Sequence, residues 1–306
     1  MNRYLRCTFV AAASAATMFA AHATDDSSRN ESGKDSASNG AAFGASVKSS
    51  PLQVIALTSD QRLIVFQDNQ PGSARDIGSI NGLMSGDTVV GIDFRVQDGK
   101  LYGVTRSGGI YVIDHNTAQA IKVSQLSVAM EGTEFGVDFN PAADRLRIVS
   151  DSGQNLRHNV NAGGTTLVDD PLDYPPATPL NAVGPNASGV SASAYTNNDL
   201  DATTATTLFA INSGLDQLAL QSPPNDGTLA SVGKLDTDAG VQIGFDIYST
   251  LRDGVTVGVE GLASVASENG TATLYRVNLA TGKLRAAGNF ASQNKVIGIA
   301  IPLAQR

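Results

Sequence analysis

The sequence predicts an all-β fold, and within that class a β-propeller of five four-stranded blades. Three observations lead to this prediction: the strand pattern, a repeat along the chain, and the way the two ends of the folded part complement each other. Long helical patterns are missing. Short alternating or β-branched runs are separated by Gly, Asn, Asp and Pro instead, which is typical of all-β proteins.

One short pattern recurs: a glycine, an apolar residue, usually an aspartate, and a second apolar residue. It occurs as VVGIDFRV (89–96), EFGVDFNP (134–141), QIGFDIYS (242–249) and VIGIAIPL (296–303). The glycines are 45, 108 and 54 residues apart, and the double interval contains a degenerate copy, VSASAYTN (190–197), with Ala192 in place of the glycine. Five copies at this period indicate five structural units of one kind.

Each complete unit contains four short strands, since three further runs joined by tight turns follow the copy, as in KLYGVTR, IYVID and AIKVSQL. Such a unit matches one propeller blade. The last copy has no strands after it, whereas the folded part begins near Pro51 with strands two to four. We therefore expect the N- and C-terminal segments to complete one blade together, which closes the ring without an open sheet edge.

The N-terminus has the features of a secretory signal peptide. Residues 1–23 contain a basic start (Arg3, Arg6), a short apolar run and the small-residue ending AHA. Residues 24–50 are rich in Ser, Gly and Asn, so we expect a flexible linker, followed by a single propeller domain over 51–306. The only cysteine, Cys7, lies in the leader. We expect an exported protein, periplasmic or extracellular, without disulfides.

The charge balance restricts the partners. The chain has 21 Lys and Arg against 29 Asp and Glu, a net charge of −8. This disfavours nucleic acid and anionic membranes, which need a basic surface. No later segment is apolar for long enough to span a bilayer, so we expect no integral membrane insertion. The expected partner is a small molecule, a polysaccharide or a protein, and the expected state is a monomer.

Three aspartates are the first candidate site. Asp93, Asp138 and Asp246 occupy the same position in three copies of the repeat. First strands line a propeller's axis, so their carboxylates would converge there and could bind a hard cation, with calcium the best fit and no other cofactor indicated. The alternative is structural: each carboxylate accepts hydrogen bonds from the backbone of the next blade. Both interpretations stay open.

A second candidate is a ligand-binding face formed by the turns between second and third strands and by the long loop at 172–190. Its candidate residues are Arg147, Asp151, Gln154, Asn155, Asp173 and Tyr174. Turn geometry alone also favours such polar residues, and Arg147 could instead pair with a carboxylate between blades. The loop could likewise be a proline-stiffened surface segment without a ligand.

The two histidines that follow the leader, His115 and His158, fall near turns between third and fourth strands. We expect both to be solvated on the outer rim. A Ser-His-Asp triad or a histidine zinc site is therefore not predicted.

The chain resembles the family of exported bacterial proteins catalogued as domain of unknown function 4394. The segments GIDFRVQDGKLYGV, FGVDFNPAADRLRIVSDSGQNLR, AYTNN and PPNDGTL carry the resemblance, which covers residues 52 to 303. It implies a secreted, propeller-like domain and supplies no activity or catalytic residues.

Three functions are consistent with the sequence. The leading hypothesis is a secreted or periplasmic module that binds a ligand or partner. The first alternative is a metal-assisted hydrolase or lyase with Asp93, Asp138 and Asp246 around a central cation, and the second is a structural envelope protein. A propeller fold supports all three.

Overall fold

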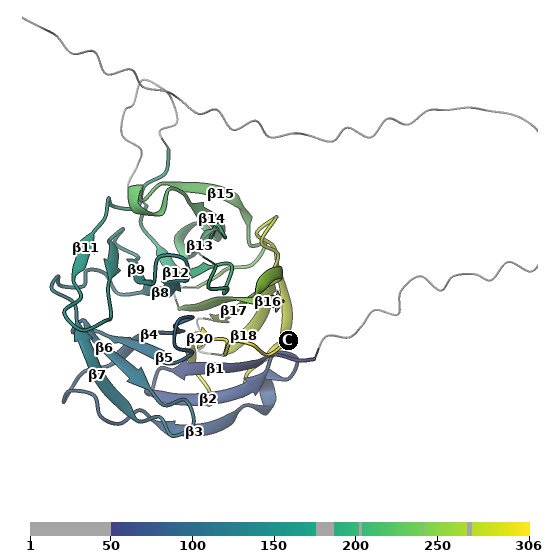
Figure 1. Cartoon of the computed structure of the whole chain (residues 1–306). Helices are drawn as coiled ribbons and strands as arrows, with labels where there is room; N and C mark the ends of the chain where they lie inside the picture. Colours follow the sequence, from purple (N-terminus) through teal and green to yellow (C-terminus); the bar gives the residue numbers. More distant parts are fainter. Residues whose placement is uncertain (1–49, 176–186, 202–203, 241, 268–270) are drawn as a thin grey trace, which may run out of the picture. The chain divides into compact units, whose positions relative to one another are not determined.

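The computed structural model of the chain describes residues 50–175, 187–201, 204–240, 242–267 and 271–306. Within these residues, twenty strands form five four-stranded antiparallel sheets, which stand around one axis as the blades of a β-propeller (Figure 1). The predicted fold class and blade number are therefore confirmed. The predicted signal peptide and all but the last residue of the predicted linker lie outside the described residues.

We number the blades in chain order and give the strands of each from the axis outward. Blade 1 consists of β20 (Val296–Ala300), β1 (Gln53–Thr58), β2 (Arg62–Gln67) and β3 (Arg75–Ser79). Blade 2 consists of β4 (Val89–Phe94), β5 (Leu101–Thr105), β6 (Gly109–Ile113) and β7 (Ala120–Gln125). Blade 3 consists of β8 (Phe135–Asn140), β9 (Arg145–Ser150), β10 (Asn155–His158) and β11 (Thr166–Val168).

Blade 4 consists of β12 (Val190–Tyr195), β13 (Leu208–Asn212), β14 (Gln217–Gln221) and β15 (Leu229–Lys234). Blade 5 consists of β16 (Ile243–Arg252), β17 (Val255–Ala266), β18 (Ala272–Val277) and β19 (Leu284–Asn289). Short 3-10 helices lie in the connections of blades 1 and 4, namely η1 (Pro71–Ser73), η2 (Ser213–Leu215) and η3 (Pro224–Asp226). None of the helices in the described part of the chain is both long and apolar enough to cross a bilayer.

Blade 1 is built from both ends of the described chain. β20 pairs antiparallel with β1, so that Ile55 lies opposite Ala300 and Leu57 opposite Gly298. Past β20, the side chain of Gln305 accepts a hydrogen bond from the backbone N–H of Gln53 (2.7 Å) and donates one to its carbonyl (2.9 Å). The predicted closure of the ring by the terminal segments is confirmed.

The inner strands approach one another closely at the repeated glycine. A Cβ atom on Gly136 would lie 2.5 Å from the backbone nitrogen of Ser193 on the next inner strand, and one on Gly91 would lie 2.4 Å from Cγ2 of Val137. Both distances are shorter than a van der Waals contact. The glycine therefore marks the point where neighbouring blades meet, which explains why this position recurs in the sequence.

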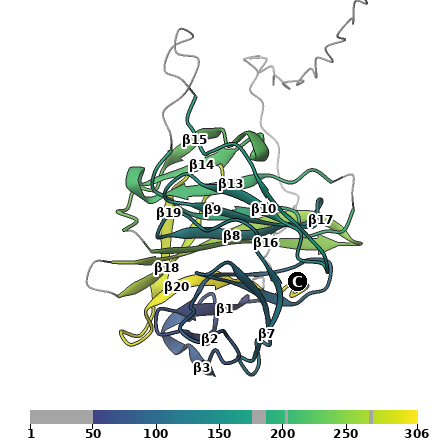
Figure 2. The same ribbon diagram turned by 90° about the vertical axis from the view of Figure 1, so that its left-hand side faces the viewer.

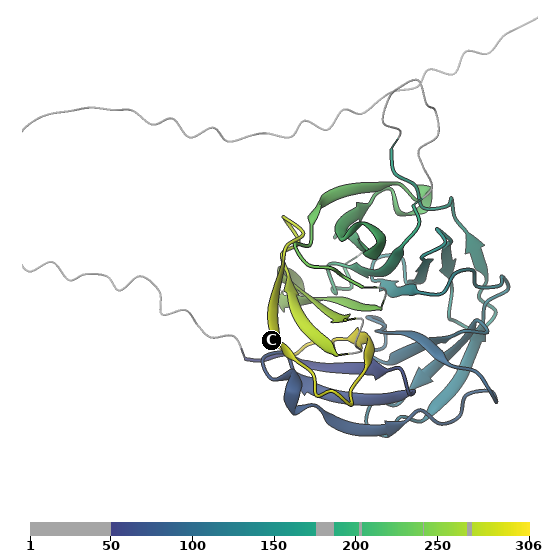
Figure 3. The ribbon, with the colours of Figure 1, turned by 180° about the vertical axis from the view of Figure 1, so that it is seen from behind.

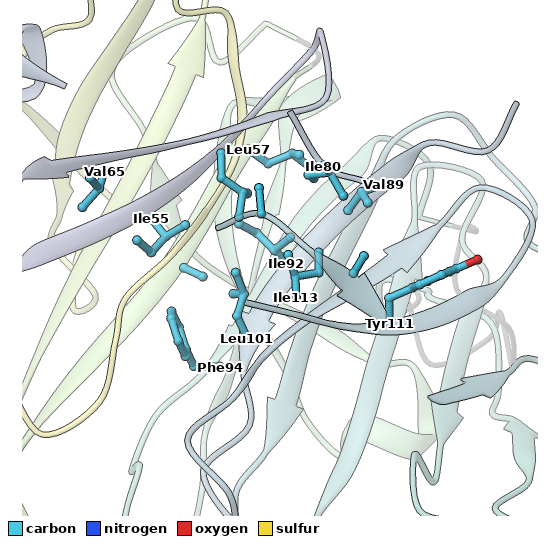
Figure 4. Packing of buried hydrophobic residues seen from close by; sticks show 14 residues of the cluster. Ile55, Leu57, Val65, Ile80, Val89, Ile92, Phe94, Leu101, Tyr111 and Ile113 are labelled. Atoms are coloured by element: carbon cyan, nitrogen blue, oxygen red, sulfur yellow. The ribbon is translucent and has the colours of Figure 1, made fainter. Parts of the chain in front are cut away.

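The hydrophobic core is divided into five clusters, each between two neighbouring blades. Successive side chains of a strand point to opposite faces of the sheet, so one strand contributes to two clusters. In β1, Ile55 and Leu57 pack toward blade 2, whereas Val54 and Ala56 pack toward blade 5. Figure 4 shows the cluster between blades 1 and 2. Burial on both faces explains why middle strands such as β5 (LYGVT) and β6 (GIYVI) consist almost entirely of apolar residues.

The two ends of the axis differ in chemistry. Val89 at the start of β4 lies opposite Thr105, next to the β5–β6 turn, whereas Asp93 lies opposite Tyr102, next to the β4–β5 turn. We call the first the glycine end and the second the carboxylate end. Figures 1 and 3 view the ring from its two sides. In the side view, β16 and β17, which are 10 and 12 residues long, extend past the other strands (Figure 2).

Candidate carboxylate site on the propeller axis

Three buried carboxylates meet at the carboxylate end of the axis. Asp93 lies on β4, Asp138 on β8 and Asp246 on β16, with exposed fractions of 6%, 4% and 6%. Each offers one oxygen such that the three oxygens lie within 4.8 Å of one another. The structure therefore brings together the three aspartates that the repeat aligned. At the same position the other two inner strands carry Ala194 and Ala300, which are too small to reach the axis.

Each carboxylate also joins its blade to the next one. Asp93 Oδ2 accepts a hydrogen bond from the backbone N–H of Phe139 (2.7 Å), and Asp138 Oδ1 accepts one from Tyr195 (3.1 Å). Asp246 Oδ2 accepts one from Ile301 (2.6 Å). The structural interpretation raised by the sequence is thus present in the geometry. It accounts for one oxygen of each carboxylate.

Burial raises the pKa of all three carboxyl groups. The pKa of Asp93 is held well above its usual value by burial and by the charge of Asp246, and that of Asp138 by burial and by the charges of Asp93 and Asp246. Burial raises the pKa of Asp246 to about 6, although backbone N–H groups of Ile301 and Ile247 oppose the shift. Three like charges this close do not ionise together without a compensating cation or proton.

A small cavity of about 10 Å³ is lined by the three carboxylates, and Tyr195 and Asn198 also contribute to its wall. This volume holds one water molecule or one ion. Phe94, Phe139 and Ile301 also belong to its lining. The axis therefore offers a site for a single small species, surrounded by carboxylate oxygen.

A larger pocket of about 390 Å³ lies next to this cavity, and Val96, Asn198 and Leu303 line both. Its other walls include Leu200 and Leu251. The volume lies in the range of about 300–1,000 Å³ that is usual for small-molecule sites. The carboxylate end of the axis thus combines a ligand-sized pocket with a polar floor.

The polar side chains of the pocket differ in whether they already form hydrogen bonds within the protein. Asp199 is buried, and its Oδ2 accepts a hydrogen bond from the hydroxyl of Thr256 on β17 (3.0 Å). The amide of Asn198 is half-buried, and no hydrogen bond links it to another described residue. Asn198 is therefore the side chain that is available to contact a bound molecule.

Arg147 and Asn155, two of the predicted ligand-binding residues, lie buried between blades 3 and 4. The Arg147 guanidinium donates to internal acceptors only: Asp169 (2.5 Å), Asn155 (2.7 Å), Asn225 (2.8 Å) and the hydroxyl of Tyr195 (3.3 Å). The amide of Asn155 donates to the carbonyls of Asp170 and Pro224 (both 3.0 Å). The apolar cluster at this interface is small and rich in alanine, and the polar network fills the rest.

Asp151 and Gln154 lie in the β9–β10 turn at the glycine end, with internal partners as well. Asp151 accepts hydrogen bonds from the backbone N–H (2.7 Å) and hydroxyl (2.5 Å) of Thr133. Gln154 accepts one from the backbone of Glu131 and donates one to the carbonyl of Ala129 (both 2.9 Å). These contacts tie the turn to the segment that leads into β8.

Asp173 and Tyr174 begin the long loop, of which residues 176–186 lie outside the described residues. The Tyr174 hydroxyl accepts a hydrogen bond from Asn212 (3.0 Å), and burial raises the pKa of this phenol. Asp173 Oδ1 is buried, and no described residue bonds to it. A ligand-binding role for this loop stays a prediction.

The expectation of a solvated His158 is wrong. This side chain is fully buried: its Nε2 lies 2.7 Å from the hydroxyl of Ser124 in blade 2, and its Nδ1 lies 3.0 Å from that of Thr166. The neighbouring blade covers the end of β10, so a position next to a turn in the sequence becomes part of an interface. His115 is half-buried, and its ring contacts Phe94 edge-on at 5.5 Å.

Sequence reasoning missed the pocket itself. Val96, Asn198 and Leu303 follow the ends of β4, β12 and β20 by two or three residues. The repeat contained a signal that could have located them, because residues just after the ends of the inner strands must surround one end of the axis.

The chain is thus a five-bladed β-propeller with a carboxylate site on its axis. Residues 62–300 match the family model described as "Domain of unknown function (DUF4394)", and the chain belongs to this family. No curated protein matches the chain.

Comparison with solved structures gives matches of low identity and low TM-score. An auxiliary nutrient binding protein from Bacteroides ovatus has 12% identity and a TM-score of 0.40 over 76% of this chain, which spans 57% of that protein. A protein of unknown function from Bacteroides thetaiotaomicron has 12% identity and a TM-score of 0.40, and the match covers 78% of this chain and 58% of that protein. A chain of the mitotic checkpoint complex has 14% identity and a TM-score of 0.39, and the match covers 81% of this chain and 77% of that one. Likenesses of this extent do not bear on the chemistry of the site.

Proposed function

We propose that this propeller is a binding module that takes a small molecule into the pocket at the carboxylate end of its axis. One observation carries the proposal: a pocket of about 390 Å³ shares Val96, Asn198 and Leu303 with the cavity of the three axial aspartates. Asp151 and Gln154 at the glycine end are occupied by internal hydrogen bonds, so the geometry favours the carboxylate end.

The lining suggests the ligand class. Val96, Leu200, Leu251 and Leu303 supply apolar walls, while Asn198 offers both a donor and an acceptor. A compact molecule with a hydrocarbon portion and hydroxyl, amide or other hydrogen-bonding groups fits this combination. A free anion is disfavoured, because Asp199 and Asp201 line the same pocket.

A fragment screen by ligand-observed NMR, run in a chelating buffer, tests this proposal. Leu251→Trp fills the pocket, and Val257→Trp is the matched control, because Val257 is 55% exposed on the same β16–β17 ribbon but does not line the pocket. We expect fragments that bind the wild type and Val257→Trp but not Leu251→Trp. For such a fragment, Asn198→Ala should weaken binding about three- to tenfold, as the loss of one hydrogen bond implies. A library in which no fragment distinguishes the two tryptophan variants would refute the pocket.

The enzymatic alternative, a metal-assisted hydrolase or lyase, draws support from the same juxtaposition of pocket and carboxylates. Turnover of ester, lactone or glycoside substrates that requires both an added divalent cation and Asp138 would support it. Binding without turnover would leave the protein a binding module.

We also propose that the chain acts outside the cytoplasm, as a monomer in the periplasm or the medium, after cleavage that follows Ala23. The sequence of the leader supports this. N-terminal sequencing of the protein from the envelope and medium fractions should give Thr24 as the first residue, and Ala21→Arg should block processing. Full-length protein confined to the cytoplasm would contradict export.

A further inference from the structure

We infer that Asp93, Asp138 and Asp246 bind one calcium ion on the propeller axis, between the inner strands of blades 2, 3 and 5. This goes beyond ligand binding in the neighbouring pocket, because the ion would be bound whether or not the pocket is filled. Three steps lead to it: the charge balance of buried carboxylates in this protein, the geometry of the three oxygens, and the oxygen atoms left without partners.

Two other carboxylates with buried side chains, Asp68 and Asp169, are neutralised by arginine, whereas buried Asp199 forms no salt bridge with a described residue and accepts hydrogen bonds from Asp201 and Thr256. Asp169 is paired with Arg147 (2.5 Å) and Arg157 (2.6 Å). Asp68 is paired with Arg276 (3.0 Å) and lies 3.9 Å from Arg306. The three axial aspartates form no salt bridge with any described residue, although they are equally buried and near each other. Since buried charges are ordinarily paired, the fold leaves the positive charge here to a ligand.

The geometry fits one calcium ion. Calcium binds oxygen at about 2.3–2.6 Å, so two ligands on opposite sides of the ion are about 4.6–5.2 Å apart. The three axial oxygens lie within 4.8 Å of one another, and the cavity between them has room for one such species. Magnesium usually keeps several of its own waters, whereas calcium takes six to eight oxygens from carboxylates, carbonyls and water in a flexible geometry. Three protein carboxylates around one cavity therefore suit calcium better than magnesium.

An unsatisfied oxygen points to the same conclusion. Asp138 is 4% exposed; its Oδ1 is used by Tyr195, and no described residue donates a hydrogen bond to its Oδ2. A cation beside this oxygen would stabilise the ionised form of the Asp138 carboxylate. Asn198 lines the cavity and its amide has no hydrogen bond to another described residue, so its carbonyl can serve as a further ligand. Water or a ligand oxygen from the pocket would complete the six to eight oxygens that calcium takes.

Calcium titration of the chelator-treated full chain by calorimetry tests the inference, with Tb³⁺ as an optical probe, because Tyr195 in the cavity wall can sensitise terbium emission. We expect one ion per chain, weaker binding of Mg²⁺, and a higher Tm with calcium. Asp138→Asn keeps an oxygen for the Tyr195 N–H but removes the charge, and should weaken calcium binding at least tenfold. Asp236→Asn is the control, because Asp236 is exposed and pairs with Lys283 instead.

Circular dichroism of Asp138→Asn shows whether the variant folds, and Asp93→Asn repeats the test if it does not. A wild-type chain that shows no calcium heat, no terbium emission and an unchanged Tm would overturn the inference, as would binding unaffected by either variant. These results are separate from those of the fragment screen, which runs in chelator and so concerns only the pocket.

Discussion

Asp138 and Tyr195 connect the axial carboxylates to the polar interface between blades 3 and 4. The Asp138 carboxylate accepts a hydrogen bond from the Tyr195 backbone N–H (3.1 Å), while the hydroxyl of the same tyrosine accepts one from Arg147 (3.3 Å). One residue of β12 thus touches both the candidate calcium site and the arginine network. The two sets of contacts therefore meet in a single buried residue, through its backbone on one side and its hydroxyl on the other.

The arginine network should be important for stability. Arg147→Ala removes four hydrogen bonds and leaves Asp169 with only one of its two arginines. We expect a loss of about 3–5 kcal/mol in the free energy of unfolding, as for other broken buried ion pairs. Urea unfolding measures it. Arg62→Ala, which breaks an exposed pair with Asp76, should cost much less, because surface ion pairs contribute little to stability. Equal losses in the two variants would contradict a structural role for the network.

The repeated glycines should differ in their tolerance to alanine. Gly136→Ala would place a Cβ 2.5 Å from the backbone of Ser193, so the inner strands must separate. We expect destabilisation of about 1–3 kcal/mol, the usual cost of overpacking. Gly298→Ala is the matched control from the same repeat position, because its Cβ would meet nothing closer than 3.7 Å. The Tm of each variant is measured by thermal unfolding and compared with that of the wild type. A Gly298→Ala variant as unstable as Gly136→Ala would disprove this account.

Glu134 should make the protein less stable as the pH rises. Burial and the charge of Asp151 raise the pKa of Glu134 to about 7, against an ordinary value of 4.5. Between these values the folded chain holds more protons than the unfolded chain, so stability is lost as the pH rises from about 4.5 to 7. Glu134→Gln should remove this loss and raise stability at pH 8 by about 1 kcal/mol after allowance for solvent screening. Urea unfolding across this range measures it. Glu131→Gln, an exposed neighbour, should leave the profile unchanged.

His158 should act in the opposite direction. Burial lowers the pKa of this imidazole below 6.5, so the unfolded chain binds the proton more readily than the folded chain. Its contribution to stability is fully present above pH 6.5 and is lost as the pH falls below that value. His158→Gln, which keeps a hydrogen-bonding side chain beside Ser124 and Thr166, should flatten the acid side of the unfolding profile. His115→Gln serves as the control, and an unchanged acid limb in the His158 variant would argue against this assignment.

The repeat predicted blade number, ring closure and the alignment of the aspartates, because spacing along the chain translates directly into position around the axis. It did not predict the environment of His158, since Ser124 lies 34 residues away and reaches it only when two blades pack. Two partners of Arg147, Tyr195 and Asn225, lie 48 and 78 residues away in the next blade and escape prediction for the same reason. Asn198 had no local pattern to distinguish it from an ordinary turn residue. Contacts within a blade can be read from the sequence, whereas contacts between blades depend on the packing angle, which no local pattern encodes.

The pairing of β20 with β1 also sets the timing of folding. The innermost strand of blade 1, β20, is made after all the other strands of the ring. A growing chain can therefore hold blades 2 to 5 and the three outer strands of blade 1 but cannot complete the ring. Until residues 296–300 emerge, β1 has a free edge and the apolar cluster with Ile299 and Ile301 is incomplete. The ring therefore closes only once residues 296–300 are available, and a chain without them would remain an open, association-prone arc however well its other blades had formed.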